Sequence, residues 1–131
     1  MSSDAIGDFL TIIRNAIKVS HRTVTAPHSK IKQSIAEILK NEGFIRDFQV
    51  LDDGNNKRTL YITLKYVNGE SVIHEITRIS TPGRRMYQGF DALQHIIGKF
   101  GISIVSTNRG IVTNKQAREL CVGGEVVCSV W

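Results

Sequence analysis

The spacing of apolar residues changes along this 131-residue chain, and that change constrains the fold more than any other feature. Up to residue 43, apolar side chains recur every three or four positions, which predicts amphipathic helices over about 5–19 and 30–42. Beyond that point alternating and β-branched runs predominate, and clusters of turn residues such as Asp52–Asn56 separate them. The chain is therefore expected to begin with two helices and to continue mainly with strands.

Both predicted helices carry residues suited to their ends. Asp4 and Ser29 can each accept a hydrogen bond from a free backbone N–H of the first turn, and Gly43 suits the position after the second helix. Each helix also has an apolar stripe that would pack on a short sheet: Ile6, Phe9, Leu10, Ile13 and Ile17 in the first, and Ile31, Ile35, Ile38 and Leu39 in the second.

Strands are predicted over 44–51 and about 60–65, with a short one near Thr23–Thr25. Asn68-Gly69 is the strongest hairpin signal, because a type I′ turn needs positive φ at both central residues. Residues 71–79 are therefore predicted as the returning strand.

The pattern changes again near residues 76–80, where we place a boundary between an N-terminal α/β subdomain over 1–77 and a C-terminal, mostly β subdomain over 78–131. Thr113 and Gln116 have the spacing of a capping box. The second subdomain is predicted to contain, in order, a turn at Thr81–Gly83, a helix over about 91–98, a strand over 102–105, a capped helix over about 114–121 and a final strand over 125–131.

Basic residues outnumber acidic ones by 17 to 12, which gives a formal net charge of +5. Acidic residues are absent between Asp8 and Glu37, between Glu75 and Asp91, and between Asp91 and Glu119, whereas lysines and arginines occur in all three intervals. Such a surplus favours a polyanionic partner, either nucleic acid or an anionic membrane surface. The alternative that these residues form ordinary solvated faces stays open.

Motifs of catalysis are missing from the sequence. It contains no Gly-x-x-x-x-Gly-Lys-Ser/Thr, no Gly-x-Ser-x-Gly and no His-Glu-x-x-His, and its four histidines lack the spacing of paired metal ligands. Cys121 and Cys128 are expected to be small buried hydrophobes in a reducing compartment, although a Cys–His nucleophile stays open as an alternative. We therefore expect no enzyme, no cofactor and no metal site. No apolar run approaches the roughly 20 residues of a membrane-spanning helix, and no signal peptide is apparent.

Gly98-Lys99-Phe100-Gly101 matches the Gly-x-x-Gly loop with which KH domains clamp a nucleic-acid backbone. A KH domain needs a helix after this loop, whereas Ile102–Val105 has the pattern of a strand. We therefore interpret the motif as a turn that ends a helix.

The segment Ser106-Thr107-Asn108-Arg109-Gly110 combines three short polar side chains with one cation. Short hydroxyl and amide groups have few rotamers to freeze, so they can hydrogen-bond to base edges and riboses at low entropic cost. The alternative is an ordinary β-turn, because the same residue types favour turns.

Four stretches resemble the family of small-ribosomal-subunit protein eight in its bacterial or organellar form. Gly101–Cys128 is similar to the family's C-terminal signature, in which Ser-Thr-Ser-x-Gly, Thr-Asp-x-x-Ala-Arg and Gly-Gly-Glu follow one another. Asp4–Ala16 resembles the opening helix, Ser34–Ile45 the second helix with the strand after it, and Arg78–Tyr87 the central motif. The resemblance covers the whole chain in the same order.

Four positions depart from the family pattern. Asn108 replaces the second serine of the loop, which puts the contact at that position in doubt, and Asn114 replaces an aspartate in the first turn of a helix. Ala5 replaces a common proline, and Thr81 replaces a lysine that would reach a phosphate.

The resemblance implies a two-subdomain α+β protein that binds the central domain of small-subunit ribosomal RNA early in assembly. It also implies neighbouring small-subunit proteins as partners, a monomer away from the ribosome, and a location in the small subunit, either cytoplasmic or inside an organelle. Some bacterial members repress their own messenger RNA. The residues expected to bind RNA or to support its binding are Ser106, Thr107, Asn108, Arg109, Gly110, Tyr87, Arg84, Arg85, Gly123, Gly124, Glu125, Lys30, Lys32 and Arg14.

Overall fold

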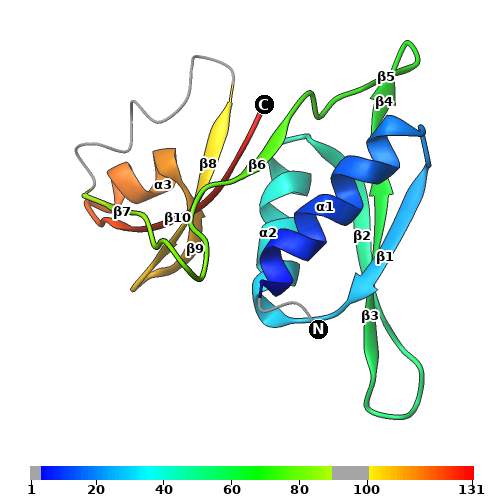
Figure 1. Ribbon diagram of the computed structural model, residues 1–131, viewed down its shortest axis with the longest axis horizontal. Coiled ribbons are helices and arrows are strands. Elements are labelled where there is room, and N and C mark those ends of the chain that lie inside the picture. The colour runs from blue at the N-terminus through cyan, green and yellow to red at the C-terminus, as the bar shows by residue number, and fades with distance from the viewer. Residues whose placement is uncertain (1–3, 90–100) are drawn as a thin grey trace. The chain divides into compact units, whose positions relative to one another are not determined.

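The computed structural model describes residues 4–89 and 101–131, and its internal contacts divide the chain into two units (Figure 1). The helix–sheet unit comprises Asp8–His74, and the β-rich unit comprises Met1–Gly7 together with Glu75–Trp131. Together they give the predicted α+β architecture. The division falls slightly before the boundary placed at residues 77 and 78, and it groups the start of the chain with its end.

The helix–sheet unit confirms the two predicted helices and their caps. Gly7 N–H donates to Asp4 Oδ1 at the start of the first helix, Ser29 Oγ accepts from Lys32 N, and Gly43 has φ of 81°. Figure 1 shows both helices to one side of a three-stranded antiparallel sheet of order β1-β3-β2. The elements are α1 (Ala5–Lys18), β1 (Thr23–Pro27), α2 (Lys30–Asn41), β2 (Ile45–Asp52) and β3 (Arg58–Leu64).

The central strand β3 shows why this sheet packs under the helices. Leu60, Ile62 and Leu64 are buried, and they alternate with partly exposed residues, as the period of two predicts. They share the core with the buried stripes of the helices, which include Phe9 and Leu39.

The predicted stripe of α2 is wrong at its first residue. Ile31 is 44% exposed, whereas Lys32 is buried. Lys32 lies three residues before Ile35 and seven before Leu39, which places it nearer the centre of the buried face than Ile31. The Lys32 stem is buried along that face while Nζ donates to Pro27 O at 3.1 Å, so the ammonium is hydrogen-bonded despite its burial.

The Asn68-Gly69 hairpin is confirmed, but its returning strand is not. Asn68 and Gly69 have φ of 53° and 80° between β4 (Tyr66–Val67) and β5 (Glu70–Ser71). A strand over 71–79 was expected, yet β5 ends at Ser71. The chain then passes into the β-rich unit, where β6 (Ile76–Arg78) pairs with the last strand of the chain. The hairpin signal is local, whereas the partner of residues 76–78 lies about fifty residues further along.

The β-rich unit confirms the predicted strands at 102–105 and 125–131 and the capped helix near 114–121. Its sheet has the order β6-β10-β8-β9, and β7 also pairs with β10. Thr113 and Gln116 form the complete capping box, and Ala117 packs with Val105 and Val126 in a small core. The elements after β6 are β7 (Tyr87–Gln88), β8 (Ile102–Thr107), β9 (Gly110–Thr113), α3 (Asn114–Glu119) and β10 (Gly124–Val130).

The predicted helix over 91–98 and the Gly98–Phe100 part of the KH-like motif lie outside the described residues. The strand that argued against a KH domain is present as β8. No helix within residues 4–89 and 101–131 is long and apolar enough to cross a membrane.

Candidate nucleic-acid interface

Three neighbouring strands of the β-rich unit bring one residue each into a single row. Glu125 of β10 lies opposite Tyr87 of β7 on one side and opposite Ser106 of β8 on the other. Directly opposed residues of antiparallel strands point to the same face of a sheet. Tyr87, Glu125 and Ser106 therefore form what we call the polar row, in which Tyr87 is 68% exposed.

The hydroxyl-rich segment beside this row is a tight β8–β9 hairpin. Thr107 pairs with Gly110, and the turn residues Asn108 and Arg109 are exposed. Gly110 has φ of 104°, a conformation that favours glycine. The β-turn is therefore confirmed, and the turn exposes Asn108 and Arg109, whereas RNA binding by this segment stays a prediction.

Thr107 has a different role from its neighbours in the hairpin. Its Oγ1 donates to Gly110 O at 2.8 Å and accepts from Arg109 N at 3.0 Å, so its single proton is used inside the turn. Within the part of the chain that the structure describes, the Ser106 and Asn108 side chains make no hydrogen bond. These two groups are the ones available to a ligand, and Thr107 holds the turn that carries them.

At Gly123 and Gly124 the backbone lies too close to the neighbouring strands β7 and β8 to leave room for a side chain. A Cβ on Gly123 would lie 2.5 Å from Gln88 O and 2.8 Å from Gly89 Cα. A Cβ on Gly124 would overlap Ser106 O and lie 3.2 Å from Thr107 Cα. The glycine pair thus lets β10 lie close to both strands that flank it.

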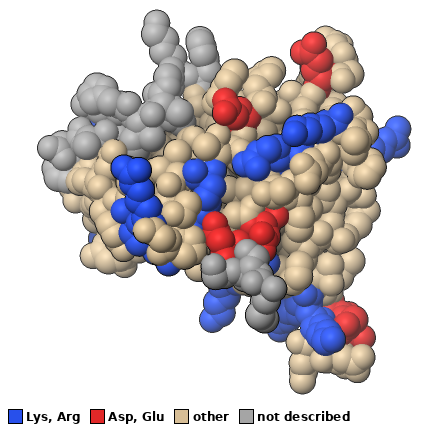
Figure 2. Space-filling view, in the orientation of Figure 1, with Lys and Arg blue, Asp and Glu red and all other residues tan. Residues whose placement is uncertain are grey.

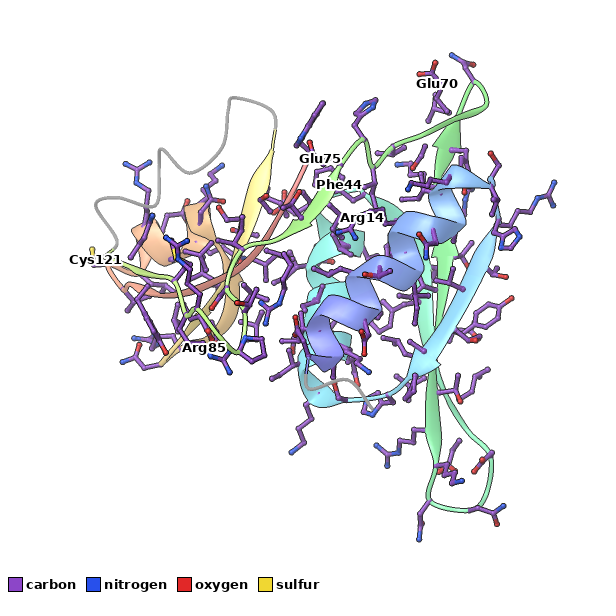
Figure 3. All side chains as sticks on the ribbon, in the orientation of Figure 1. Arg14, Phe44, Glu70, Glu75, Arg85 and Cys121 are labelled. Atoms are coloured by element: carbon purple, nitrogen blue, oxygen red, sulfur yellow. The ribbon has the colours of Figure 1, made fainter. Side chains whose placement is uncertain are left out.

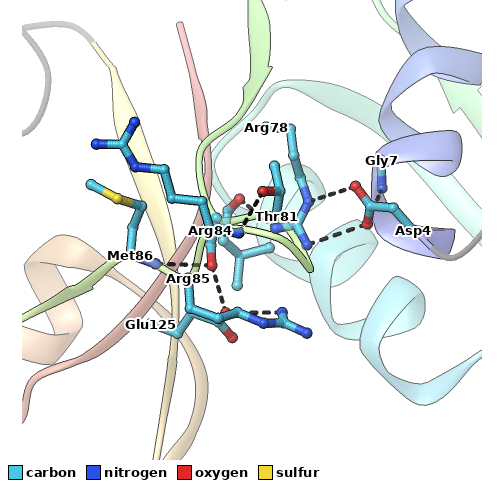
Figure 4. Close-up of polar contacts among 10 residues, drawn as sticks. Asp4, Gly7, Arg78, Thr81, Arg84, Arg85, Met86 and Glu125 are labelled. Carbon is cyan, nitrogen blue, oxygen red and sulfur yellow. Dashed lines mark hydrogen bonds and ion pairs between the residues drawn. The ribbon is translucent and has the colours of Figure 1, made fainter.

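Two hydrogen-bond donors of the protein hold the Glu125 carboxylate (Figure 4). Its Oε2 accepts from Ser80 Oγ at 2.6 Å and from Arg85 Nη1 at 3.0 Å. The Ser80 hydrogen bond and the nearby Arg85 guanidinium lower the pKa of Glu125 despite its partial burial, and the charge of Arg78 adds to this effect. Glu125 is therefore ionised at neutral pH, and its charge is balanced within the protein.

Arg78 ties the start of the chain to the strand that carries Glu125 (Figure 4). Its Nε and Nη2 donate to Asp4 Oδ2 and Oδ1 at 3.4 and 3.3 Å, and Nη1 donates to Val127 O at 2.8 Å. Val127 lies at the bulge where the register between β10 and β8 shifts. Burial opposes ionisation of Asp4, but hydrogen bonds from Gly7 N–H and Arg78 hold its pKa below the usual value.

The predicted cations fall into both units. Arg84 and Arg109 are exposed and have no acidic partner among the described residues, whereas Arg85 is paired with Glu125. The helix–sheet unit carries exposed Lys30, buried Lys32 and the half-buried Arg14, whose Nη1 lies 3.5 Å from Thr11 Oγ1. On the face shown in Figure 2, lysines and arginines appear in several places among acidic and uncharged side chains and do not form one continuous band. Such a distribution suits several separate phosphate contacts rather than one continuous groove.

The two cysteines differ, and the expectation that both are buried is wrong for one of them. Cys128 is buried, and this burial raises its pKa to about 12. Cys121 is exposed, because it follows the end of α3 in a turn with φ of 56° (Figure 3). Among the described residues, no group of three or more His, Cys, Asp or Glu side chains could hold a metal ion.

Iodoacetamide is expected to modify Cys121 and to spare Cys128 in the folded protein near pH 8, since the thiolate is the reactive form. Mass spectrometry should show one adduct on the native chain and two after unfolding in urea. Equal labelling of both thiols in the native chain would contradict the burial of Cys128.

Two residues that support this surface were not among the predicted site residues. Ser80 is fully buried and bonds Glu125, and Arg78 bonds Asp4 and Val127. Both residues lie in the Arg78–Tyr87 stretch that resembles the family's central motif, and that resemblance is the signal that could have drawn attention to them.

The fold and this surface define a small α+β protein that presents polar side chains on a strand hairpin. A family model described as "Ribosomal protein S8" matches residues 4–131, so the chain belongs to the ribosomal protein S8 family.

Curated relatives named "Small ribosomal subunit protein uS8" agree with this assignment. The chain is 53% identical over 130 residues to the protein of Lactobacillus delbrueckii subsp. bulgaricus, which covers 98% of both chains. It is 51% identical over 129 residues to that of Caldicellulosiruptor bescii, covering 98% of this chain and 97% of the relative. It is 48% identical over 132 residues to that of Desulforudis audaxviator, covering all of both chains.

Proposed function

We propose that this protein is a structural constituent of the small ribosomal subunit and binds small-subunit ribosomal RNA through the polar row and the β8–β9 hairpin. The observation that carries the proposal is the register that places Tyr87, Glu125 and Ser106 side by side next to an exposed polar turn. Membership of the ribosomal protein S8 family supports it.

The geometry suits RNA whose helix is irregular. An A-form duplex hides its major-groove edges, so a protein reads sequence mainly where bases are unpaired or displaced. Ser106 and Asn108 offer a free hydroxyl and a free amide, and Tyr87 offers an exposed ring on which a base can stack. The amide of Asn108 donates and accepts like a serine hydroxyl but reaches further, so we propose that it keeps a contact at this position.

Cations supply the part of the affinity that does not depend on sequence. We propose phosphate contacts for four cations. Arg84 lies three residues before Tyr87 and Arg109 lies in the β8–β9 turn, whereas Lys30 and Arg14 belong to the helix–sheet unit. The Lys32 ammonium already donates a hydrogen bond to Pro27 O. Lys32 can therefore contact a phosphate only if its ammonium leaves this carbonyl oxygen for a phosphate oxygen.

We further propose that the protein acts by binding alone, without catalysis, and that its target lies in the central domain of the RNA, where it binds early in assembly. Repression of its own messenger RNA and a monomeric state away from the ribosome belong to the same proposal. Membership of the ribosomal protein S8 family and the resemblance of Gly101–Cys128 to the family's C-terminal signature support this proposal.

The roles of hairpin and cation are expected to separate in binding measurements. Ser106→Ala should weaken binding to a transcript of the central domain by about 1 kcal/mol, the usual net value of one hydrogen bond, and should leave binding to an unrelated RNA unchanged. Lys30→Ala should weaken binding to both RNAs and reduce the slope of log K against log salt by about 1. Filter binding at several salt concentrations measures both effects.

Glu37→Ala serves as the control, since it removes an exposed acidic side chain from the same helix as Lys30 and should not weaken binding to either RNA. The proposed role of the hairpin fails if Ser106→Ala weakens binding to both RNAs equally.

A further inference from the structure

One buried hydroxyl links the strand that carries Glu125 to the segment that carries Tyr87. Ser80 has an exposed fraction of 0%, and its Oγ donates to Glu125 Oε2 at 2.6 Å while accepting from Met86 N at 3.1 Å. Glu125 lies 45 residues further along the chain, and Met86 lies six residues further along, after the Thr81–Arg84 turn. The Ser80 hydroxyl therefore uses its proton and one lone pair to join β10 to the residue just before β7.

One of these two bonds ends on the residue that precedes Tyr87. The segment after Ser80 turns back on itself, with Thr81 and Arg84 exchanging backbone hydrogen bonds of 3.0 and 3.1 Å. Met86 is then held from both sides, because its N–H donates to Ser80 Oγ and its carbonyl accepts from Val126 N at 2.9 Å. Tyr87 is the next residue, so its register opposite Glu125 follows from the position of Met86.

The Ser80 hydroxyl also bonds the one acidic residue of the polar row, Glu125. A free carboxylate beside Tyr87 and Ser106 would repel phosphates. Ser80 and Arg85 together turn Glu125 Oε2 toward the protein and balance its charge (Figure 4). Without Ser80, Glu125 would lose the closer of its two donors.

We propose that Ser80 is a positioning residue for RNA binding: its buried hydroxyl sets the register of Tyr87 against Glu125 and so aligns the polar row. This inference rests on the proposed function for its RNA readout, whereas the effect on the segment after Ser80 is measurable without RNA. Ser80 itself touches no ligand, because it is fully buried.

Ser80→Ala is the direct test, and Ser103→Ala is the matched control. Ser103 is a fully buried serine of β8, and no hydrogen-bond partner of its Oγ lies among the described residues, so its removal breaks no bond there. Ser80→Ala is expected to increase hydrogen exchange at the Met86 amide and to weaken binding to the central-domain transcript about fivefold or more, with less effect on an unrelated RNA. Ser103→Ala should change neither quantity.

A double variant separates positioning from general loss of structure. If Ser80 acts through Tyr87, Ser80→Ala should weaken RNA binding far less in a Tyr87→Ala background than in the wild type. Thermal unfolding shows whether each variant is folded. Ser80→Cys, which keeps nearly the same side-chain shape and forms only weak hydrogen bonds, replaces Ser80→Ala in this cycle if the latter does not fold.

The inference is overturned if Ser80→Ala binds the transcript as the wild type does, or if its effect is the same with and without Tyr87. Unchanged exchange at Met86 overturns it as well, whatever the RNA data show. If the wild type fails to prefer the transcript over unrelated RNA, the proposed function falls, and hydrogen exchange alone still decides whether Ser80 holds this segment.

Discussion

Gly124→Ala is expected to lower the free energy of unfolding by about 3 kcal/mol, at the upper end of the cost of overpacking. The added Cβ would overlap Ser106 O and lie 3.2 Å from Thr107 Cα. Both are backbone atoms, so no side-chain rotation can relieve the clash, and β8 must move away from β10. The same movement would displace Ser106 from the polar row. Urea denaturation measures the first effect, and binding to the central-domain transcript measures the second.

Gly83→Ala is the matched control for this substitution. A Cβ on Gly83 would meet no atom within 4 Å, and Gly83 does not have the positive φ that favours glycine. Its replacement should change the free energy of unfolding by less than about 0.5 kcal/mol. If the two alanine variants were equally stable, the close approach of β8 and β10 would not be the reason for glycine at position 124.

Arg78→Met is expected to lower the free energy of unfolding by about 2–3 kcal/mol. Breaking a buried ion pair costs roughly 3–5 kcal/mol, and the Asp4 side chain is 25% exposed, so water recovers part of this cost. The substitution keeps most of the apolar stem but removes the donors to Asp4 and to Val127 O. Chemical denaturation at neutral pH measures the loss.

Arg85→Met provides the comparison, because Arg85 also pairs with a carboxylate but its side chain is 49% exposed. Its loss should cost less than about 1 kcal/mol. Equal losses for the two arginine variants would contradict the special role assigned to Arg78.

The pH dependence of stability gives a second readout for Arg78. The folded protein lowers the pKa of Asp4 below its ordinary value of 3.8. The ionised carboxylate therefore stabilises the fold fully at pH values above 3.8, and this contribution is lost as the pH falls through the lowered pKa. In Arg78→Met the lowering of the pKa is reduced, so the decrease in stability between about pH 5 and pH 2 should be smaller than in the wild type. Urea titrations across that range make the comparison.

The parts of the fold that depend on near neighbours in sequence were predictable. The caps at Asp4, Ser29 and Thr113 were expected from residue types a few positions apart, and all three form hydrogen bonds with their own helices. The parts that depend on distant partners were not. The expected strand over 71–79 ends early because residues 76–78 pair with β10, a choice that no local pattern encodes.

The candidate site divides in the same way. The residue types of the hairpin indicated exposed polar groups, and the resemblance to a family added Tyr87 and Glu125. The use of the Thr107 hydroxyl inside the turn, and the role of Ser80, depend on geometry that spacing does not reveal. Burial of Lys32 was missed because its charge suggested solvent, although its place on the helix face favoured burial.

The two residues at the tip of the β8–β9 hairpin can be substituted without disturbing the turn. The bend is maintained by the Thr107 hydroxyl and the left-handed backbone at Gly110, whereas Asn108 and Arg109 are not among the residues with positive φ and so have a backbone that L-amino acids adopt readily. The two outermost positions can therefore vary in size and charge while the bend keeps its shape. Substitutions at these two positions can therefore adapt the tip to a different RNA while the pairing of β8 with β9 stays the same.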